Sequence, residues 1–500
     1  MFENAELGHR VSREEYDREA PLIRADLLDL QEQLKLADFP VLLIVAGVDG
    51  AGKSETANHL LWWMDARGIE TSAFGDPTDE ERERPRFWRY WRALPQHGKI
   101  GILFNSWYSD PMDDRVDGRI TVPELDQELE RIVAFEEMLV HDGALVLKFW
   151  LHITRDAQRA RLKALRRDPR QSWRVTDREW EAHKHYDDYR QVAERVLRKT
   201  SQGETPWHVV DGSNERFRTL SVTRILRDAL RERLAEFERR QAAAPPPPPT
   251  HPIPAPVNAL SSLDLTVALE REAYQQELLN YQGTLNRLIR TMQHKRRSLL
   301  LVFEGPDAAG KGGAIRRLTA AMDARDYRVI SIAAPNEEER AHPYLWRFWR
   351  HLPQVGRVTV FDRSWYGRVL VERIEGFCST EDWRRAYAEI NDFEEQLHEF
   401  GIVVVKFWLA IGLDEQMLRF REREETPHKR FKMTDEDWRN REKWGVYEAA
   451  ACDMIERTST DIAPWTLVEA NDKRWARVKV LRTICERLQH ALETPVSDPE

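Results

Sequence analysis

The sequence predicts a duplicated α/β fold, in which a parallel sheet is flanked by helices. Two observations lead to this prediction. Short apolar runs rich in β-branched residues alternate with helical segments, which is typical of a parallel sheet covered on both faces. The second half of the chain also repeats the first at a constant offset, since Lys311 lies 258 residues after Lys53 (311 − 53) and Trp346 lies equally far after Trp88.

The repeat defines the domain organisation. An offset that holds over most of each half indicates duplication without insertions, and its period is far too long for a solenoid. A Pro-rich stretch between the halves is expected to form an extended spacer. We therefore predict an N-terminal domain over residues 1–241, a linker over 242–258, a C-terminal domain over 259–492 and a disordered tail over 493–500.

Composition excludes several classes of protein. The formal net charge is −9, so the chain is not expected to coat nucleic acid, and an anion site would have to be a local basic patch. Three widely spaced cysteines indicate neither a disulfide framework nor a zinc site. A polar N-terminus and the lack of a long apolar run predict a cytoplasmic protein with no membrane partner. Whether it forms a homo-oligomer is left open.

Each half is predicted to begin with a helix and to continue with a strand, a glycine-rich loop and a second helix. In the second half the first helix is expected over Leu269–Met292. The charged, helical segment Gln416–Arg441 has too little apolar surface for a core position, and we interpret it as a mobile lid. The strands are expected at 41–45, 299–303, 358–361 and 402–405.

Both glycine-rich loops match a phosphate-binding motif. Gly47–Ser54 fits GxxxxGK[ST] in full, and Gly305–Lys311 fits GxxxxGK. Glycines allow backbone N–H groups to face a phosphate, the following helix adds favourable potential, and the lysine supplies a point charge. The alternative is a glycine-rich turn with a solvated lysine. The predicted phosphate-binding residues are Gly305, Ala308, Ala309, Gly310, Lys311, Gly312 and Gly313.

Two aspartates are candidate magnesium ligands. The second loop lacks the Ser/Thr that normally helps to hold Mg²⁺ but contains Asp307, which would repel phosphate unless a cation lay between them. Asp362 ends the strand that precedes Arg363 and Arg368, where a P-loop enzyme places its metal-oriented carboxylate. The two arginines can fork onto phosphate oxygens. The alternatives are a turn-capping aspartate and a surface Asp–Arg pair.

The first half lacks the equivalents of Asp362, Arg363 and Arg368. At the same offset, Asp362 falls on Phe104, Arg363 on Asn105 and Arg368 on Asp110, although Asp49 keeps the loop carboxylate. Phosphoryl transfer depends on positioning and charge neutralisation. We therefore expect only the C-terminal half to catalyse. The N-terminal half is expected to be structural, and a regulatory polyanion site there remains open.

The predicted lid is rich in cations. Its candidate ligands for a long polyanion include Arg419, Arg423, Lys429 and Lys432, although glutamates interrupt them. Interleaved charges are also typical of a solvated helix face. The first half replaces Arg423 by Leu165 and Lys429 by Gln171, so the basic excess is weaker where the carboxylate and arginines are missing.

Taken together, these motifs resemble polyphosphate kinase family 2. The residues that show the resemblance are GPDAAGKGG (305–313), FDRSWYGR (361–368), KFWL (406–409) and KRFKMTDEDW (429–438). The likeness covers nearly all of 263–488 and, more loosely, 12–230. It implies a P-loop kinase-like domain in which Asp307, Lys311, Asp362 and Arg363 are essential. It also implies that Arg368 and Arg363 lie near an acceptor nucleotide, and that basic lid residues line a polyphosphate channel.

The family resemblance implies a reaction. A fused pair of units resembles members that move the terminal phosphoryl group of inorganic polyphosphate to AMP, giving ADP. Phosphorylation of ADP to ATP by polyphosphate is an alternative, as is an ATP-dependent nucleoside monophosphate kinase. A non-catalytic anion-binding pair is a further alternative, but such a module would not need Asp307, Lys311 and Asp362 together.

Overall fold

The computed structural model describes residues 1–170, 172–242, 259–426 and 435–493. Of these, residues 1–77, 89–242 and 336–343 group into an N-terminal unit. Residues 78–88, 259–335 and 344–493 group into a C-terminal unit. The predicted linker, the tail and the centre of the predicted lid therefore lie almost wholly outside the described residues.

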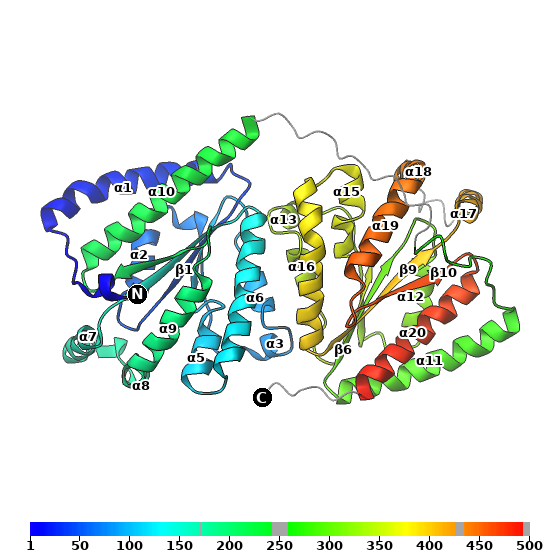
Figure 1. Cartoon of the computed structure of the whole chain (residues 1–500), viewed down its shortest axis with the longest axis horizontal. Coiled ribbons are helices and arrows are strands. Elements are labelled where there is room, and N and C mark those ends of the chain that lie inside the picture. The colour runs from blue at the N-terminus through cyan, green and yellow to red at the C-terminus, as the bar shows by residue number, and fades with distance from the viewer. Residues whose placement is uncertain (171, 243–258, 427–434, 494–500) are drawn as a thin grey trace. The chain divides into compact units, whose positions relative to one another are not determined.

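The elements of the first half follow the predicted alternation of strand and helix (Figure 1). They are η1 (Glu3–Glu6), α1 (Arg13–Leu34), β1 (Val41–Gly47), α2 (Lys53–Trp63), η2 (Ala66–Gly68), β2 (Ile69–Ala73), α3 (Asp79–Arg82), α4 (Trp88–Arg92), β3 (Ile100–Phe104), α5 (Ser109–Val116), α6 (Val122–His141), β4 (Leu145–His152), α7 (Arg155–Arg167), η3 (Ser172–Arg174), α8 (Asp177–Lys184), α9 (Tyr186–Thr200), β5 (Trp207–Asp211) and α10 (Glu215–Ala242).

The second half repeats this order, and the boundaries of its strands agree with the offset to within a residue. Its elements are α11 (Arg271–His294), β6 (Ser298–Glu304), α12 (Lys311–Thr319), β7 (Tyr327–Ser331), α13 (Glu337–Arg340), α14 (Trp346–Trp349), β8 (Val358–Asp362), η4 (Trp365–Arg368), α15 (Val371–Glu375), α16 (Thr380–Glu399), β9 (Ile402–Ala410), α17 (Leu413–Glu425), α18 (Asp435–Glu442), α19 (Trp444–Thr458), β10 (Trp465–Glu469) and α20 (Lys473–Glu493).

Each half forms a five-stranded sheet, in the orders β2-β3-β1-β4-β5 and β10-β9-β6-β8-β7, and every paired strand is parallel. Within each unit, helices cover both faces of the sheet (Figure 1). The predicted fold class is confirmed. The central strands β1 and β6 have neighbours on both sides, and the carboxyl end of such a switch point is where open α/β sheets bind ligands.

The central strand of the C-terminal unit is buried on both faces. Residues 299–303 are all fully buried, which agrees with an uninterrupted apolar run. The predicted exclusion of the lid segment from the core is wrong for α17, because Gln416, Arg419 and Phe420 are 2, 4 and 0% exposed. Charged residues outnumber apolar ones on this helix, and the buried face is therefore built around one aromatic ring and two long polar side chains.

A buried lysine anchors the turn after β8. Lys406 Nζ lies 2.7 Å from Glu394 Oε2, Tyr366 Oη and the Thr458 carbonyl oxygen. Lys148 makes the corresponding set of bonds in the N-terminal unit. A buried charge needs such partners to offset its desolvation. The shared KFWL and WY motifs therefore hold the fold of both units, whatever their activity.

Among the described helices, none is both long enough and apolar enough to cross a bilayer.

Candidate active site

The second phosphate-binding loop joins β6 to α12 at the centre of the sheet edge. Gly305 has φ +137°, and a Cβ there would lie 2.5 Å from the Leu409 carbonyl oxygen, so no larger residue fits. The loop lines a pocket of 560 Å³ through Ala308, Ala309, Gly310, Lys311, Gly312 and Gly313. These predicted phosphate-binding residues are thus brought together around one hollow, whereas Gly305 lines a second pocket.

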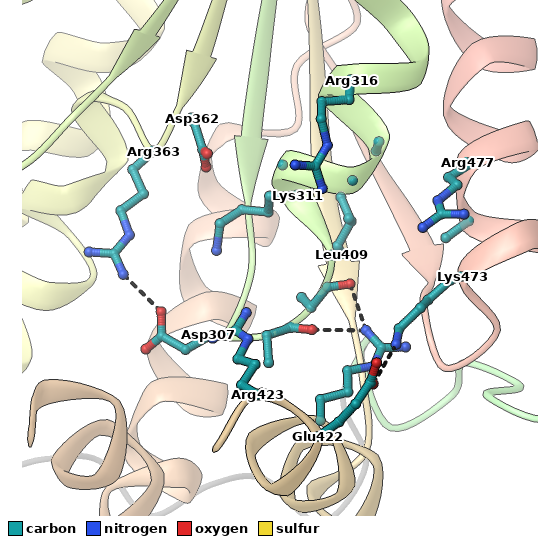
Figure 2. A pocket seen from close by; sticks show the side chains of 18 residues that line it. Asp307, Lys311, Arg316, Asp362, Arg363, Leu409, Glu422, Arg423, Lys473 and Arg477 are labelled. Carbon is teal, nitrogen blue, oxygen red and sulfur yellow. Dashed lines mark hydrogen bonds and ion pairs between the residues drawn. The ribbon is translucent and has the colours of Figure 1, made fainter. Parts of the chain in front are cut away.

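Asp307, Lys311, Asp362 and Arg363 converge at one side of this pocket (Figure 2). Arg363 Nη2 donates to Asp307 Oδ1 over 2.8 Å, and Asn440 Nδ2 donates to Asp307 Oδ2 over 2.9 Å. Burial by itself would raise the pKa of Asp307, but Lys311 and Arg363 outweigh it and lower this pKa. Asp307 is therefore held ionised beside the loop lysine.

The two aspartates fit a cation that is shared with a phosphate. Among the described residues, the Asp362 carboxylate has no hydrogen-bond or ion-pair partner, and its side chain lines the same pocket as Asp307. In the same part of the chain, no three His, Cys, Asp or Glu side chains are grouped to hold a metal. The two carboxylates of Asp307 and Asp362 suit Mg²⁺, which is usually bound by one or two carboxylates plus phosphates and water.

The rest of the pocket lining is mainly basic (Figure 2), although Glu422 also lies there and accepts a hydrogen bond from Lys473 over 3.2 Å. Beyond the predicted Arg423, it contains three cations that the sequence analysis missed: Arg316 on α12 and Lys473 and Arg477 on α20. They were missed because charged residues on a predicted helix are usually interpreted as part of its solvated surface. The offset could have revealed them, because the equivalent positions are Asn58, Glu215 and Thr219.

A second pocket of 310 Å³ adjoins the first, and both include Asp307 and Arg363. Its lining is mainly apolar. Part of its wall comes from the segment 260–265 that precedes α11, which sequence patterns did not predict. The side chains that carry its apolar character include Leu260, Leu263, Leu265, Leu370, Val371, Trp408, Ile411, Leu413 and Trp444.

Glu304 is a further residue that the sequence analysis missed. It ends β6, is 5% exposed and accepts a hydrogen bond from Ser364 Oγ at 2.8 Å. Burial raises the pKa of this carboxyl, although Lys311 and Arg363 partly oppose the shift. The residue lines the second pocket and has Ala46 as its counterpart, a difference that the offset could have shown.

The remaining predicted site residues differ in their placement. Arg368 lines neither pocket; its Nε lies 2.8 Å from Glu372 Oε2 and its guanidinium lies over the Tyr344 ring. Arg419 borders the first pocket but is nearly fully buried. Lys429 and Lys432 lie outside the described residues.

The first loop has the same shape and a different charge pairing. Lys53 Nζ donates to Asp49 Oδ1 over 3.0 Å and to the Gly47 carbonyl oxygen over 2.7 Å. Lys53 lowers the pKa of Asp49, although burial opposes this. Asn105 stands where Arg363 would be, so the loop carboxylate pairs with its own lysine instead.

The N-terminal unit also has a different side chain at the position of Leu260. Phe2 is fully buried and stacks on His152 and Trp150, with ring centroids 4.4 and 6.0 Å away. His152 Nε2 lies 2.9 Å from Glu6 Oε1 in η1. By the offset, Trp150 corresponds to Trp408 of the apolar pocket. In the N-terminal unit the ring of Phe2 therefore packs against the equivalent tryptophan.

Comparison with known proteins agrees with this arrangement. The family described as Polyphosphate kinase 2 (PPK2) matches residues 10–238 and 268–495. The chain is 53% identical to a polyphosphate:AMP phosphotransferase of Pseudomonas aeruginosa over 98% of this chain and 99% of that one. It is 50% identical to the protein of that name from Pseudomonas syringae pv. tomato, with 98 and 99% covered. A crystal structure of a polyphosphate kinase 2 from Pseudomonas aeruginosa superimposes with a TM-score of 0.88 at 51% identity, covering 99% of this chain and 100% of that one.

Proposed function

Because the chain belongs to the polyphosphate kinase 2 family, we propose that its C-terminal unit transfers the terminal phosphoryl group of inorganic polyphosphate to AMP, giving ADP. One observation carries the assignment of roles: a basic pocket and an apolar pocket meet at Asp307 and Arg363. A polyanion fits the first, and the nucleoside of the acceptor fits the second. The acceptor phosphate would then face the end of the donor chain at the shared residues.

The charged groups around the junction suit in-line transfer. An oxygen of the AMP phosphate attacks the terminal phosphorus of polyphosphate, and the bond from that phosphorus to the bridging oxygen breaks. The shortened polyphosphate leaves with the bonding electrons, and no proton has to be moved. Lys311 and Arg363 offset the charge on the moving group, which is the main requirement of phosphoryl transfer.

Asp307 and Asp362 would hold Mg²⁺, which when bound neutralises charge on the donor and acceptor phosphates. The protein residues account for the rest of the site. The basic wall formed by Arg316, Arg423, Lys473 and Arg477 binds the donor chain. The apolar pocket orients the nucleoside and limits the access of water, which would otherwise accept the phosphoryl group.

The proposal is tested with purified full-length protein and Mg²⁺. Polyphosphate with AMP should yield ADP in the absence of ATP. Parallel reactions with polyphosphate and ADP, and with ATP and AMP, separate this reaction from its two alternatives. Formation of ADP only when ATP is the donor would assign the protein to the nucleoside monophosphate kinases instead.

For the N-terminal unit we propose a structural role. The equivalents of five pocket residues that carry charge in the C-terminal unit, Arg316, Asp362, Arg363, Arg423 and Arg477, are uncharged in the N-terminal unit, and Lys473 is replaced by Glu215. Its loop lysine is already paired with Asp49. A unit with these changes lacks the charges needed both to bind a polyanion and to move a phosphoryl group.

A further inference from the structure

Every N–H donor of the Arg419 guanidinium is hydrogen-bonded within the protein. Nε donates to Glu415 Oε1 over 2.6 Å. Nη1 donates to the carbonyl oxygens of Ala308 and Ala309 over 2.9 and 3.0 Å. Nη2 donates to those of Ala470 and Asn471 over 2.6 and 2.8 Å. A guanidinium has five N–H donors, so none is left for a phosphate.

These bonds tie the phosphate-binding loop to the chain that follows β10. The C=O of Ala309 and the N–H of Gly310 share one planar peptide and point in opposite directions. When Arg419 holds that carbonyl, the N–H of Gly310 is directed away from the guanidinium. Gly310 lines the basic pocket, so the orientation of this donor depends on a contact made behind the loop.

Ala308 explains why the loop needs such a contact. Its φ is +63°, in the left-handed region that costs a residue with a Cβ free energy. Arg419 binds the carbonyl of this strained residue. In the N-terminal unit the equivalent residue is Gly50, which has φ +80° without that cost.

The N-terminal unit supplies a guanidinium to the same place from another helix. Arg161, the equivalent of Arg419, pairs with Glu55 instead. Arg218 of α10, which replaces Ala476, is 2% exposed and donates to the carbonyl oxygens of Gly212 and Ala51 over 2.9 and 3.5 Å. These two residues are equivalent to Ala470 and Ala309. The contact is therefore present in both units, although the residue that makes it has moved.

We propose that Arg419 is a positioning residue, which holds the loop in its phosphate-binding conformation and does not itself bind polyphosphate. The inference rests on the proposed function for its kinetic readout, and on structure alone for its stability readout. It distinguishes Arg419 from Arg423, one turn later on α17, which lines the same pocket and faces the donor.

The kinetic test is a double-mutant cycle in the full-length protein, with kcat and KM for polyphosphate measured. Arg419→Ala should lower kcat about 100-fold, as expected for a misplaced loop, and change KM less than about threefold. In the Ala308→Gly background, Arg419→Ala should lower kcat only about tenfold, because glycine tolerates the left-handed conformation. Arg419→Lys, with three donors, should fall between arginine and alanine.

Arg423→Ala is the matched control. It should mainly raise KM for polyphosphate, and by the same factor in the Ala308→Gly background. If Arg419→Ala instead raises KM with kcat retained, and Ala308→Gly leaves the cost unchanged, Arg419 binds the donor and the proposal is overturned. An inactive wild type would count against the proposed function alone.

Thermal unfolding tests the relocated contact independently of activity. Arg218→Ala should lower the Tm of the N-terminal unit by about 4–8 °C, because buried carbonyl groups lose a charged donor. Arg161→Ala, which removes only a half-exposed ion pair, should lower it by less than about 2 °C. Equal shifts from both changes would show that the guanidinium contact did not move to Arg218.

Discussion

The two phosphate-binding loops have the same backbone course, but their aspartates pair with different cations. In the C-terminal unit Asp307 pairs with Arg363, while the described neighbours of Lys311 Nζ within hydrogen-bonding distance are the carbonyl oxygens of Gly305 and Pro306. In the N-terminal unit Asp49 pairs with Lys53. A loop motif thus identifies a phosphate-binding shape. Whether its lysine charge is available depends on an arginine two strands away in sequence.

The largest expected difference between the units is catalytic. Lys311→Ala should reduce the rate of ADP formation about 10³-fold, because the lysine offsets charge on the transferred group. Lys53→Ala should leave the rate within about twofold. Initial rates of ADP formation at saturating polyphosphate and AMP measure both. Comparable losses from the two substitutions would show that the N-terminal unit takes part in catalysis.

The apolar pocket gives the second comparison. Phe2→Ala should destabilise the N-terminal unit by about 3 kcal/mol, since it empties a fully buried aromatic site. Leu260→Ala, at the equivalent position, should change stability little because Leu260 is only half-buried and lines an open pocket.

Denaturant unfolding measures the first effect, and KM for AMP measures the second. We expect Leu260→Ala to raise KM for AMP about threefold through lost apolar contact. An unchanged KM for AMP, together with a raised KM for polyphosphate, would contradict the assignment of the two pockets.

Exchanging charge at the start of the last helix of each unit gives a smaller effect. Lys473→Glu should raise KM for polyphosphate about fivefold, because it replaces the cation that pairs with Glu422 on the basic wall by a second carboxylate. This increase in KM should be smaller at high salt, which screens exposed charges. The mirror substitution Glu215→Lys should leave KM within about twofold. A fall in KM after that change would place a donor site in the N-terminal unit.

The fold was predictable because its signals are local and occur twice. The run 299–303 is apolar without interruption and is fully buried, and a glycine-rich loop follows it. The loss of Asp362 and Arg363 in the first half was visible by alignment at the offset. Both inferences needed only residue type and position.

The parts of the site that could not be predicted depend on which way side chains point. Arg419 and Arg423 lie on one charged helix and both border the pocket. Nothing in their spacing indicates that Arg419 is nearly fully buried against the loop carbonyls while Arg423 is partly exposed. The contribution of segment 260–265 was equally hidden, because apolar residues next to a Pro-rich linker have no periodic pattern.

Glu304 provides the finest comparison, since burial raises the pKa of its carboxyl and Ala46 replaces it in the other unit. The unfolded chain ionises this group from about pH 4.3 upward, whereas the folded protein resists ionisation. The folded state therefore loses stability as pH rises above about 4.3. Glu304→Gln removes the ionisation and keeps the shape of the side chain. Its Tm should exceed that of the wild type by a margin that grows as pH rises above about 4.3, the pKa of the unfolded group. Ala46→Gln should show no such pH-dependent margin, and a constant difference for Glu304→Gln would mean that the carboxyl titrates alike in both states.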